Sequence, residues 1–189
     1  MKTARDVCSS PSSPAAEPAA TETAQGRAPR LECRPAASAA DLAAHYAVRR
    51  QVFVREQGIF PVDDGDGHDD APDVIHVVGL VDGRVRGAVR LYPLDRAAGL
   101  WKGDRLAVLD NHRHHGLGAP LVRFAVRVAG QCGGREMVAY IQPDNARFFE
   151  HLGWRRVGGL EDYVGVPHQR MVIALAAANV SGGPSPTRR

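Results

Sequence analysis

The chain has 189 residues and a formal net charge of +3, with a sequence pI of about 9.0. The positive excess lies near the two ends, because residues 31–187 carry 18 basic and 18 acidic side chains. A neutral central segment without a basic stripe argues against nucleic acid as a partner. The chain also lacks an apolar run of 18 residues, so we expect no membrane span.

The three cysteines, Cys8, Cys33 and Cys132, are far apart and have no metal-ligand spacing. A sparse, odd number of cysteines is typical of a reducing compartment. The first residues also lack the apolar stretch of a signal peptide. We therefore expect a cytoplasmic protein without a bound metal.

Residues 1–30 are rich in Ala, Pro, Ser and Thr and show no apolar periodicity, which predicts a disordered N-terminal tail. Residues 177–189 predict a disordered C-terminal tail for the same reason. The segment between them, residues 31–176, is long enough to form one domain with a single core.

The first predicted element is a short strand at residues 31–34. Ser38 is a suitable N-cap for a helix that covers residues 41–57 and ends at Gly58. Arg49 falls at helical spacing on the same face as the apolar side chains of this helix. An acidic loop, PVDDGDGHDDAPD, follows. Next come two strands at residues 73–94, separated by the turn sequence Asp82-Gly83.

A strand at residues 105–109 leads into NHRHHGLGAPLVRFAVRVAG, where an Arg-x-x-Gly-x-Gly loop precedes an apolar-periodic helix. The unpaired N–H groups at a helix start attract anions, and glycines let the backbone approach a bulky one. Arg113, Gly116 and Gly118 therefore predict a phosphate-binding loop. The alternative is a tight turn that only reverses the chain.

The remaining elements are a strand at 136–142, a short helix at 145–152 closed by Gly153, and two terminal strands at 155–159 and 168–175. The order β-α-β-β-β-α-β-α-β-β predicts an α+β domain. We expect a mixed, mostly antiparallel sheet with helices on both faces. Two hairpin strands before the phosphate loop exclude a doubly wound dinucleotide fold.

Three motifs, RLAVLDNHRHHGLGAPLV, AYIQPDN and NARFFEHLGW, together with this element order resemble the GNAT acyltransferases over about residues 31–175. The segments YAVRRQVFVREQGIF, RLYPL and PHQRM, with the acidic loop, look more narrowly like the nitrogen-starvation N-acyltransferases. The resemblance implies acetyl-CoA or another acyl-CoA as cosubstrate, held where the strands at 105–109 and 136–142 splay apart. It implies that the backbone N–H of Val108 polarises the thioester carbonyl. The cofactor-binding residues that it implies are Leu106, Ala107, Val108, Arg113, His114, His115, Gly116, Leu117, Gly118, Ala119, Asn145 and Phe149.

One position departs from this family. Many members carry a tyrosine that protonates the departing thiolate where this chain has Phe149, which has no proton to donate. A thiol has a pKa near 8.5, so its thiolate is a tolerable leaving group that could take a proton from water. Tyr163 or Tyr140 could substitute for the missing acid.

The acidic loop contains Asp63, Asp64, Asp66, Asp69 and Asp70, which repel one another unless they are solvated, metal-bound or paired with cations. Its spacing does not fit an EF-hand. One interpretation is a solvated loop, in which Arg49 pairs with a carboxylate and anchors the segment. The other is an acidic wall that attracts a substrate ammonium, with the substrate-binding residues Arg49, Phe53, Asp66, Asp69 and His76.

A second resemblance links the N-terminal half to acylhomoserine lactone synthases, which share the fold and take the acyl group from a carrier protein. It lies in Arg49-x-x-x-Phe53, Asp64-x-Asp66-x-x-Asp69 and Arg90-Leu91-Tyr92-Pro93. Those enzymes generally lack the Arg-x-x-Gly-x-Gly loop present here. Coenzyme A is therefore the expected donor and a carrier protein is the alternative.

Acylation of an amine requires removal of its proton. His168, His76, Glu56 and Asp104 are candidate bases, and an ordinary histidine already titrates near neutral pH. A purely structural role for His168 at the start of a strand stays open. The catalytic residues that we predict are His168, Glu56 and Tyr163.

These observations together predict a cytoplasmic N-acyltransferase that transfers an acetyl or other acyl group to a small primary amine by direct attack in a ternary complex. We expect no nucleic-acid or membrane partner, and a homodimer stays open. A non-enzymatic alternative is an acyl-CoA sensor in which Phe149 leaves the domain catalytically silent.

Overall fold

The computed structural model of the chain describes residues 27–163 and 165–176. Within this part of the chain, seven strands form one sheet in the order β1-β2-β3-β4-β5-β7-β6. Most of the tail predicted at residues 1–30, and the tail predicted at 177–189, lie outside the described residues. Their disorder stays a prediction. No helix in the described part is long and apolar enough to cross a membrane.

The elements follow the predicted order. The strands are β1 (Leu31–Pro35), β2 (Ile75–Val81), β3 (Arg84–Asp95), β4 (Leu100–Val108), β5 (Glu136–Ile141), β6 (Arg155–Tyr163) and β7 (Val166–Ala174). The helices are α1 (Ala39–Arg49), α2 (Gly118–Gln131) and α3 (Ala146–His151). A π-helical segment (Arg50–Glu56) continues α1, and 3₁₀ turns (Asp110–His115 and Pro143–Asn145) precede α2 and α3. The strand pairs are antiparallel except for the parallel pair β4–β5.

The predicted α+β fold is confirmed, and two strand boundaries differ from expectation by four residues or more. β4 begins at Leu100 rather than at residue 105, because a tight turn with Gly99 at φ 67 returns the chain directly from β3. β6 extends to Tyr163 rather than ending at residue 159, because its end pairs with the start of β7 across a short turn. The helix that starts at Ala39 is capped by the Ser38 side chain, as the sequence predicts.

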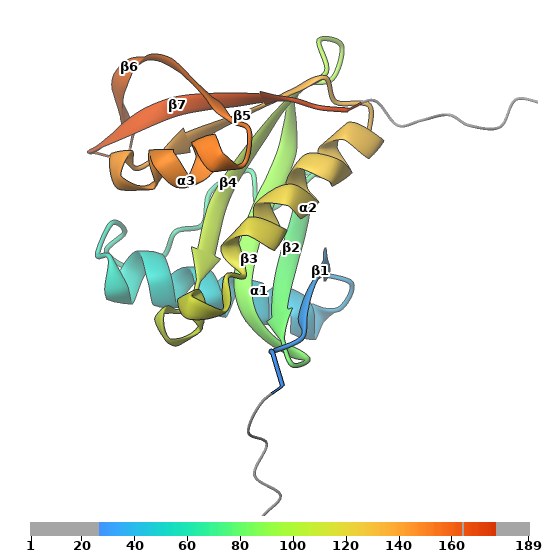
Figure 1. Cartoon of the computed structure of the whole chain (residues 1–189), viewed down its shortest axis with the longest axis vertical. Helices are drawn as coiled ribbons and strands as arrows, with labels where there is room; N and C mark the ends of the chain where they lie inside the picture. Colours follow the sequence, from blue (N-terminus) through green and yellow to red (C-terminus); the bar gives the residue numbers. More distant parts are fainter. Residues whose placement is uncertain (1–26, 164, 177–189) are drawn as a thin grey trace, which may run out of the picture.

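Helices cover opposite faces of the sheet (Figure 1). α1 and the π-helical segment pack through Val48 and Val52 against Ala88 and Ala107. On the other face, α2 packs through Leu121 and its neighbours onto the main core, which also takes in side chains of α3. Gly87 permits this close approach, because a Cβ there would lie 2.7 Å from a Leu121 methyl. The first turn of α2 is thereby held against the sheet.

β4 and β5 pair only at their beginnings. The register joins Leu100 to Glu136, Trp101 to Met137 and Lys102 to Val138, and no later pair follows in the described strands. Beyond this point the two strands diverge, which Figure 1 shows between their labels.

A β-bulge lies in the part of β4 that leaves β5. The register of β3 with β4 shifts between Ala88 and Arg90, and Arg105 has a φ of 53. A bulge adds one residue to a strand and reverses which face the later side chains occupy. Trp101 before the bulge faces α2, whereas Ala107 after it faces α1.

Candidate active site

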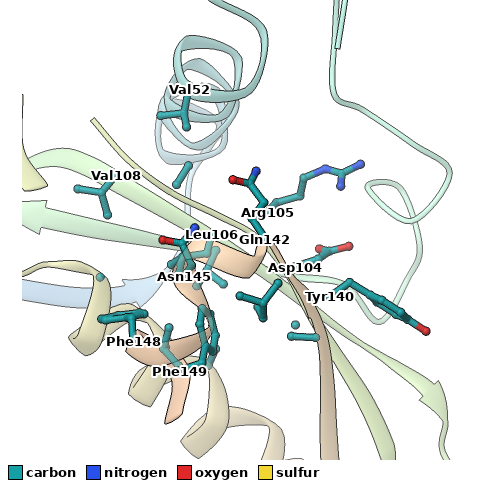
Figure 2. A pocket seen from close by; sticks show the side chains of 18 of the residues that line it. Val52, Asp104, Arg105, Leu106, Val108, Tyr140, Gln142, Asn145, Phe148 and Phe149 are labelled. Carbon is teal, nitrogen blue, oxygen red and sulfur yellow. The ribbon is translucent and has the colours of Figure 1, made fainter. Parts of the chain in front are cut away.

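A cavity of about 540 Å³ lies where β4 and β5 diverge. Figure 2 shows Val108 and Phe148 toward one end of it and Asp104 and Tyr140 toward the other. Its wall includes most of the predicted cofactor-binding residues, together with Phe53, Tyr163 and His168. The predicted cofactor residues in the wall are Leu106, Ala107, Val108, Arg113, Gly116, Gly118, Ala119, Asn145 and Phe149.

The N-terminus of α2 contributes free backbone N–H groups to this cavity. Gly116 N donates to Arg113 O at 3.0 Å within the turn. In residues 27–163 and 165–176, no protein group accepts a hydrogen bond from the backbone N–H of Leu117, Gly118 or Ala119. Gly116 turns the chain with a φ of 75, and a Cβ there would meet nothing within 4 Å. Open space beside unpaired amides at a helix start suits an anion such as a diphosphate.

The other three residues of the predicted loop set lie differently. The Leu117 side chain is buried under α2 beside Gly87. His114 is exposed and His115 half-buried, and the cavity wall does not include them. Their backbone lies in the 3₁₀ turn before α2.

The edge of β4 beyond the bulge offers further backbone groups. Leu109 N donates to Arg86 O at 3.0 Å, so the N–H of Leu109 points toward β3. Backbone groups alternate along an antiparallel strand, so the N–H of Val108 points away from β3, toward the side that β5 has left. Leu106 has the same orientation. This geometry suits an extended ligand along the edge of β4 and fits the predicted donor role of Val108.

Arg113 and Glu56, which we predict in two different roles, form an ion pair with each other. Arg113 also pairs with Asp110 at 2.9 Å and donates from Nε to Val108 O at 3.2 Å. The Arg113 side chain is 43% exposed, so it stays accessible to a ligand. Glu56 is not part of the cavity wall.

Phe149 lies in the wall, as the motif predicts, and is buried. Its ring contacts the Trp154 ring edge-to-face, with 5.4 Å between the ring centres. Hydroxyl groups in the same cavity come from Tyr140 and Tyr163, whose rings stack with centres 5.4 Å apart. That one of them replaces the acid missing at Phe149 stays a prediction.

His168 is buried in the same wall, close to Tyr163, with 5.3 Å between the ring centres. The Nδ1 atom lies 2.8 Å from Val166 O. A carbonyl oxygen only accepts hydrogen bonds, so Nδ1 carries the proton and donates it. In the neutral ring Nε2 then keeps its lone pair, which is the state that a general base requires.

Three aspartates of the acidic loop, Asp64, Asp66 and Asp69, pair with arginines, whereas Asp63 and Asp70 are exposed. Four aspartates and three arginines form what we call the arginine–aspartate network: Asp64, Asp66, Asp69, Asp104, Arg49, Arg90 and Arg105. Arg49 and Arg90 have fully buried side chains. The anchoring role predicted for Arg49 is therefore observed, and it involves Asp64 at 2.8 Å and Asp69 at 2.5 Å.

The network holds two of its carboxylates, Asp66 and Asp69, in the charged form. Burial of Asp66 opposes ionisation, but hydrogen bonds and charge from Arg90 outweigh it and lower the pKa of Asp66 to about 2. The same competition, decided by Arg49, lowers the pKa of Asp69. Each carboxylate that we predict to contact substrate already faces a guanidinium, so a substrate role for Arg49, Asp66 and Asp69 stays a prediction.

His76 lies in the same region and outside the cavity wall. Its Nε2 is 3.1 Å from Asp69 O, and its Nδ1 is 3.2 Å from Nε2 of the fully buried His45. Burial lowers the pKa of both histidines, to about 3 for His45. The structure thus surrounds His76 with protein groups, and of the predicted substrate residues Phe53 alone is part of the cavity wall described here.

Sequence reasoning assigned no role to Arg90 and Arg105 of the network or to Lys102 beside the cavity. Arg90 occupies the middle of an apolar strand, and a buried charge of that kind needs a partner. Its position in the strand was therefore the one sequence signal that Arg90 has a buried acidic partner. Arg105 and Lys102 gave none, because polar residues in a half-exposed strand are ordinary. Among the described residues no group of three or more His, Cys, Asp or Glu could hold a metal.

A mixed sheet that opens between two strands beside a helix with free amides defines the class of this protein: an acyltransferase with the acyl-CoA N-acyltransferase fold. The chain belongs to the GNAT acetyltransferase family, because residues 41–154 match the model described as "Acetyltransferase (GNAT) family". The family resemblance stated from the sequence is therefore confirmed. Enzymes of this family use an acyl-CoA cosubstrate.

Individual relatives agree with this assignment. The N-acetyltransferase YjcF of Bacillus subtilis, itself uncharacterised, is 27% identical over 128 residues, which is 67% of this chain and 88% of YjcF. A crystal structure from Lactobacillus plantarum, provisionally described as an N-acetyltransferase, is 29% identical with a TM-score of 0.68, covering 77% of this chain and 98% of that one. Escherichia coli ElaA, at 22% identity and a TM-score of 0.65, covers 76% and 98% and shows the shared fold.

Proposed function

We propose that this protein transfers an acetyl or other acyl group from acyl-CoA to a small primary amine by direct attack in a ternary complex. One cavity contains both the free amides of α2 and the His168 side chain, and this observation carries the proposal. The bound thioester supplies an activated acyl carbon. The chain's own residues must then bind the diphosphate, orient the thioester and accept the proton of the amine.

The residues divide these tasks along the cavity. The amides of Leu117, Gly118 and Ala119 would bind the diphosphate. The outward N–H of Val108 would donate to the thioester oxygen, as an oxyanion-hole donor does. At the other end, Nε2 of His168 would accept the amine proton, and Tyr163 Oη would donate a proton to the departing sulfur.

The first test separates cofactor binding from folding. Gly118 has an ordinary φ, and a Cβ there would lie 3.4 Å from Phe148 Cζ, at ordinary contact distance. Gly118→Val should therefore fold while its methyl groups block the approach to the free amides. We expect the Kd for CoA, measured by calorimetry, to rise at least 100-fold. The matched control is Gly67→Val, where a Cβ meets nothing within 4 Å, outside the cavity. Unchanged CoA affinity in Gly118→Val would refute the phosphate-loop assignment.

The second test separates an enzyme from a sensor. Thiol release from acetyl-CoA is measured across a panel of primary amines, for the wild type and for His168→Gln. We expect turnover with at least one amine and a loss of about 100-fold in kcat in the variant, the range for removal of a general base. CoA binding without thiol release on any amine would favour the acyl-CoA sensor. Release that requires an acyl carrier protein would favour the alternative donor.

A further inference from the structure

Lys102 lies beside the wall of the cavity at its amine end. Its Nζ is 3.5 Å from Tyr163 Oη. The same ammonium lies 4.9 Å from the centre of the Tyr163 ring and 5.4 Å from the centre of the Tyr140 ring. Both tyrosines line the cavity. Their electron-rich faces hold the cation in place.

In residues 27–163 and 165–176, this cation has no anionic partner. Among the described residues, no carboxylate lies within 4.0 Å of Lys102 Nζ, and the same holds for the guanidinium of Arg170. Arg170 is the register partner of Tyr140 on β7, and its buried Nε has no hydrogen-bond acceptor. Asp104, on the same face of β4 as Lys102, is bound by Arg90 through two hydrogen bonds of 2.8 Å. A partly desolvated cation without a counter-ion favours an anionic ligand.

The proposed base and this cation flank one side chain. The His168 ring centre lies 5.3 Å from the centre of the Tyr163 ring. Lys102 Nζ lies 4.9 Å from the centre of the same ring. These contacts with one ring limit the separation of His168 from Lys102, so an acceptor whose amine reaches His168 can place a second group near Lys102. An anionic group on the carbon next to the amine is placed to meet it.

From this geometry we infer that the acceptor is an α-amino acid, with its amine directed to His168 and its carboxylate bound by Lys102 with support from Arg170. The inference rests on the proposed function and names its substrate class. In the earlier interpretation, the acidic loop attracts the ammonium of the substrate. In this inference, Lys102 and Arg170 attract its carboxylate instead. The aspartates of that loop that belong to the network are paired with arginines, whereas neither cation pairs with a carboxylate in the part of the chain that the structure describes.

The experiment compares matched acceptors at saturating acetyl-CoA. Each set contains an amino acid, its α-amide and the amine that lacks the carboxylate, with the same side chain throughout, for several side chains. Thiol release should show a kcat/KM at least tenfold higher for the free amino acid than for the amide. Equal values for the two would overturn the inference.

Variants identify the responsible cation. In Lys102→Met the KM for the amino acid should rise at least tenfold while the KM for the amide and the Kd for CoA stay unchanged. Lys102→Arg keeps the charge and should keep most of the preference. Arg155→Gln is the control, because that exposed arginine pairs with Glu136 outside the cavity. A preference that survives in Lys102→Met would overturn the assignment.

Failure of the proposed function has a different signature, because then no acceptor releases thiol. In that case the inference is decided by binding alone. Saturation-transfer NMR with the CoA complex should detect the amino acid more strongly than its amide, and Lys102→Met should abolish the difference. Equal signals would overturn it.

Discussion

Two groups of charged side chains lie around β4, and they differ in whether their cations contact carboxylates. On the side of α1, every arginine of the arginine–aspartate network contacts at least one carboxylate. On the side of β5 and β7, Lys102 contacts the rings of Tyr140 and Tyr163, and neither Lys102 nor Arg170 contacts a described carboxylate. The first arrangement satisfies its charges within the protein and stabilises the fold. The second leaves positive charge for a ligand, so the two regions should respond oppositely to mutation.

The largest expected effect tests the structural side. Arg90 is fully buried and bound to Asp66 and Asp104. Arg90→Met should lower the free energy of unfolding by about 3–5 kcal/mol, because it leaves the buried Asp104 without a cation and Asp66 with Arg105 alone. Urea denaturation measures this change. A loss below about 1 kcal/mol would show that the network does not stabilise the fold.

The pH dependence of stability is the next effect. His45 is neutral when folded because burial lowers its pKa to about 3, whereas an unfolded histidine titrates near 6.5. The unfolded chain therefore binds a proton that the folded chain refuses between these values, and stability rises with pH in that window. His45 alone should contribute about 2 kcal/mol between pH 5 and pH 7. The shift of Asp66 acts only below about pH 4.

Urea denaturation at pH 5, 6 and 7 measures this slope. His45→Gln should flatten it, and substitution of the exposed His114 by Gln should leave it unchanged. A slope that is the same in His45→Gln as in the wild type would assign the effect to other groups.

A third, smaller effect concerns the ion pair of Glu56 and Arg113, whose side chains are 28% and 43% exposed. Exposed pairs contribute little, so Glu56→Gln should change the free energy of unfolding by less than about 1 kcal/mol. With His168 as the base, kcat should also fall less than tenfold. A loss of two orders of magnitude in kcat with unchanged stability would instead assign the base to Glu56.

The smallest expected effect tests the ligand side. Lys102→Met should change the free energy of unfolding by only about 0.5 kcal/mol, since methionine fills the same space and only cation–π contacts and one long hydrogen bond to Tyr163 Oη are lost. The thermal midpoint of the apo protein measures this. A destabilisation comparable to that of Arg90→Met would show that Lys102 is structural and that the contrast between the two regions is wrong.

Local patterns predicted most of the fold. The hairpin at Asp82-Gly83, the cap at Ser38 and the glycine loop before α2 each depend on residues close together in the chain, so the sequence alone is informative there. The start of β4 at Leu100 was missed because WKGD lacks the β-branched residues that indicate a strand. Its partners on β3 and β5 stabilise it instead.

The candidate site divides in the same way. The free amides of α2 and the place of Phe149 follow from contiguous motifs. The pairing of Arg90 with Asp66 and Asp104 joins a strand to a loop and to a second strand, and nothing in the order of residues selects these partners. The contact of Lys102 with Tyr163 connects positions far apart in sequence and could not be predicted either.

The extra residue at Arg105 divides β4 into two segments with opposite substitution rules. Before it, even-numbered positions tolerate charge and odd-numbered positions require apolar or small side chains. After it, Ala107 takes the α1 side while Leu106 and Val108 face α2. A deep mutational scan of this strand would show that the alternation between tolerant and intolerant positions shifts by one residue at Arg105. Deletion of Arg105 would remove the bulge. Every side chain after it in β4 would then face the opposite side of the sheet.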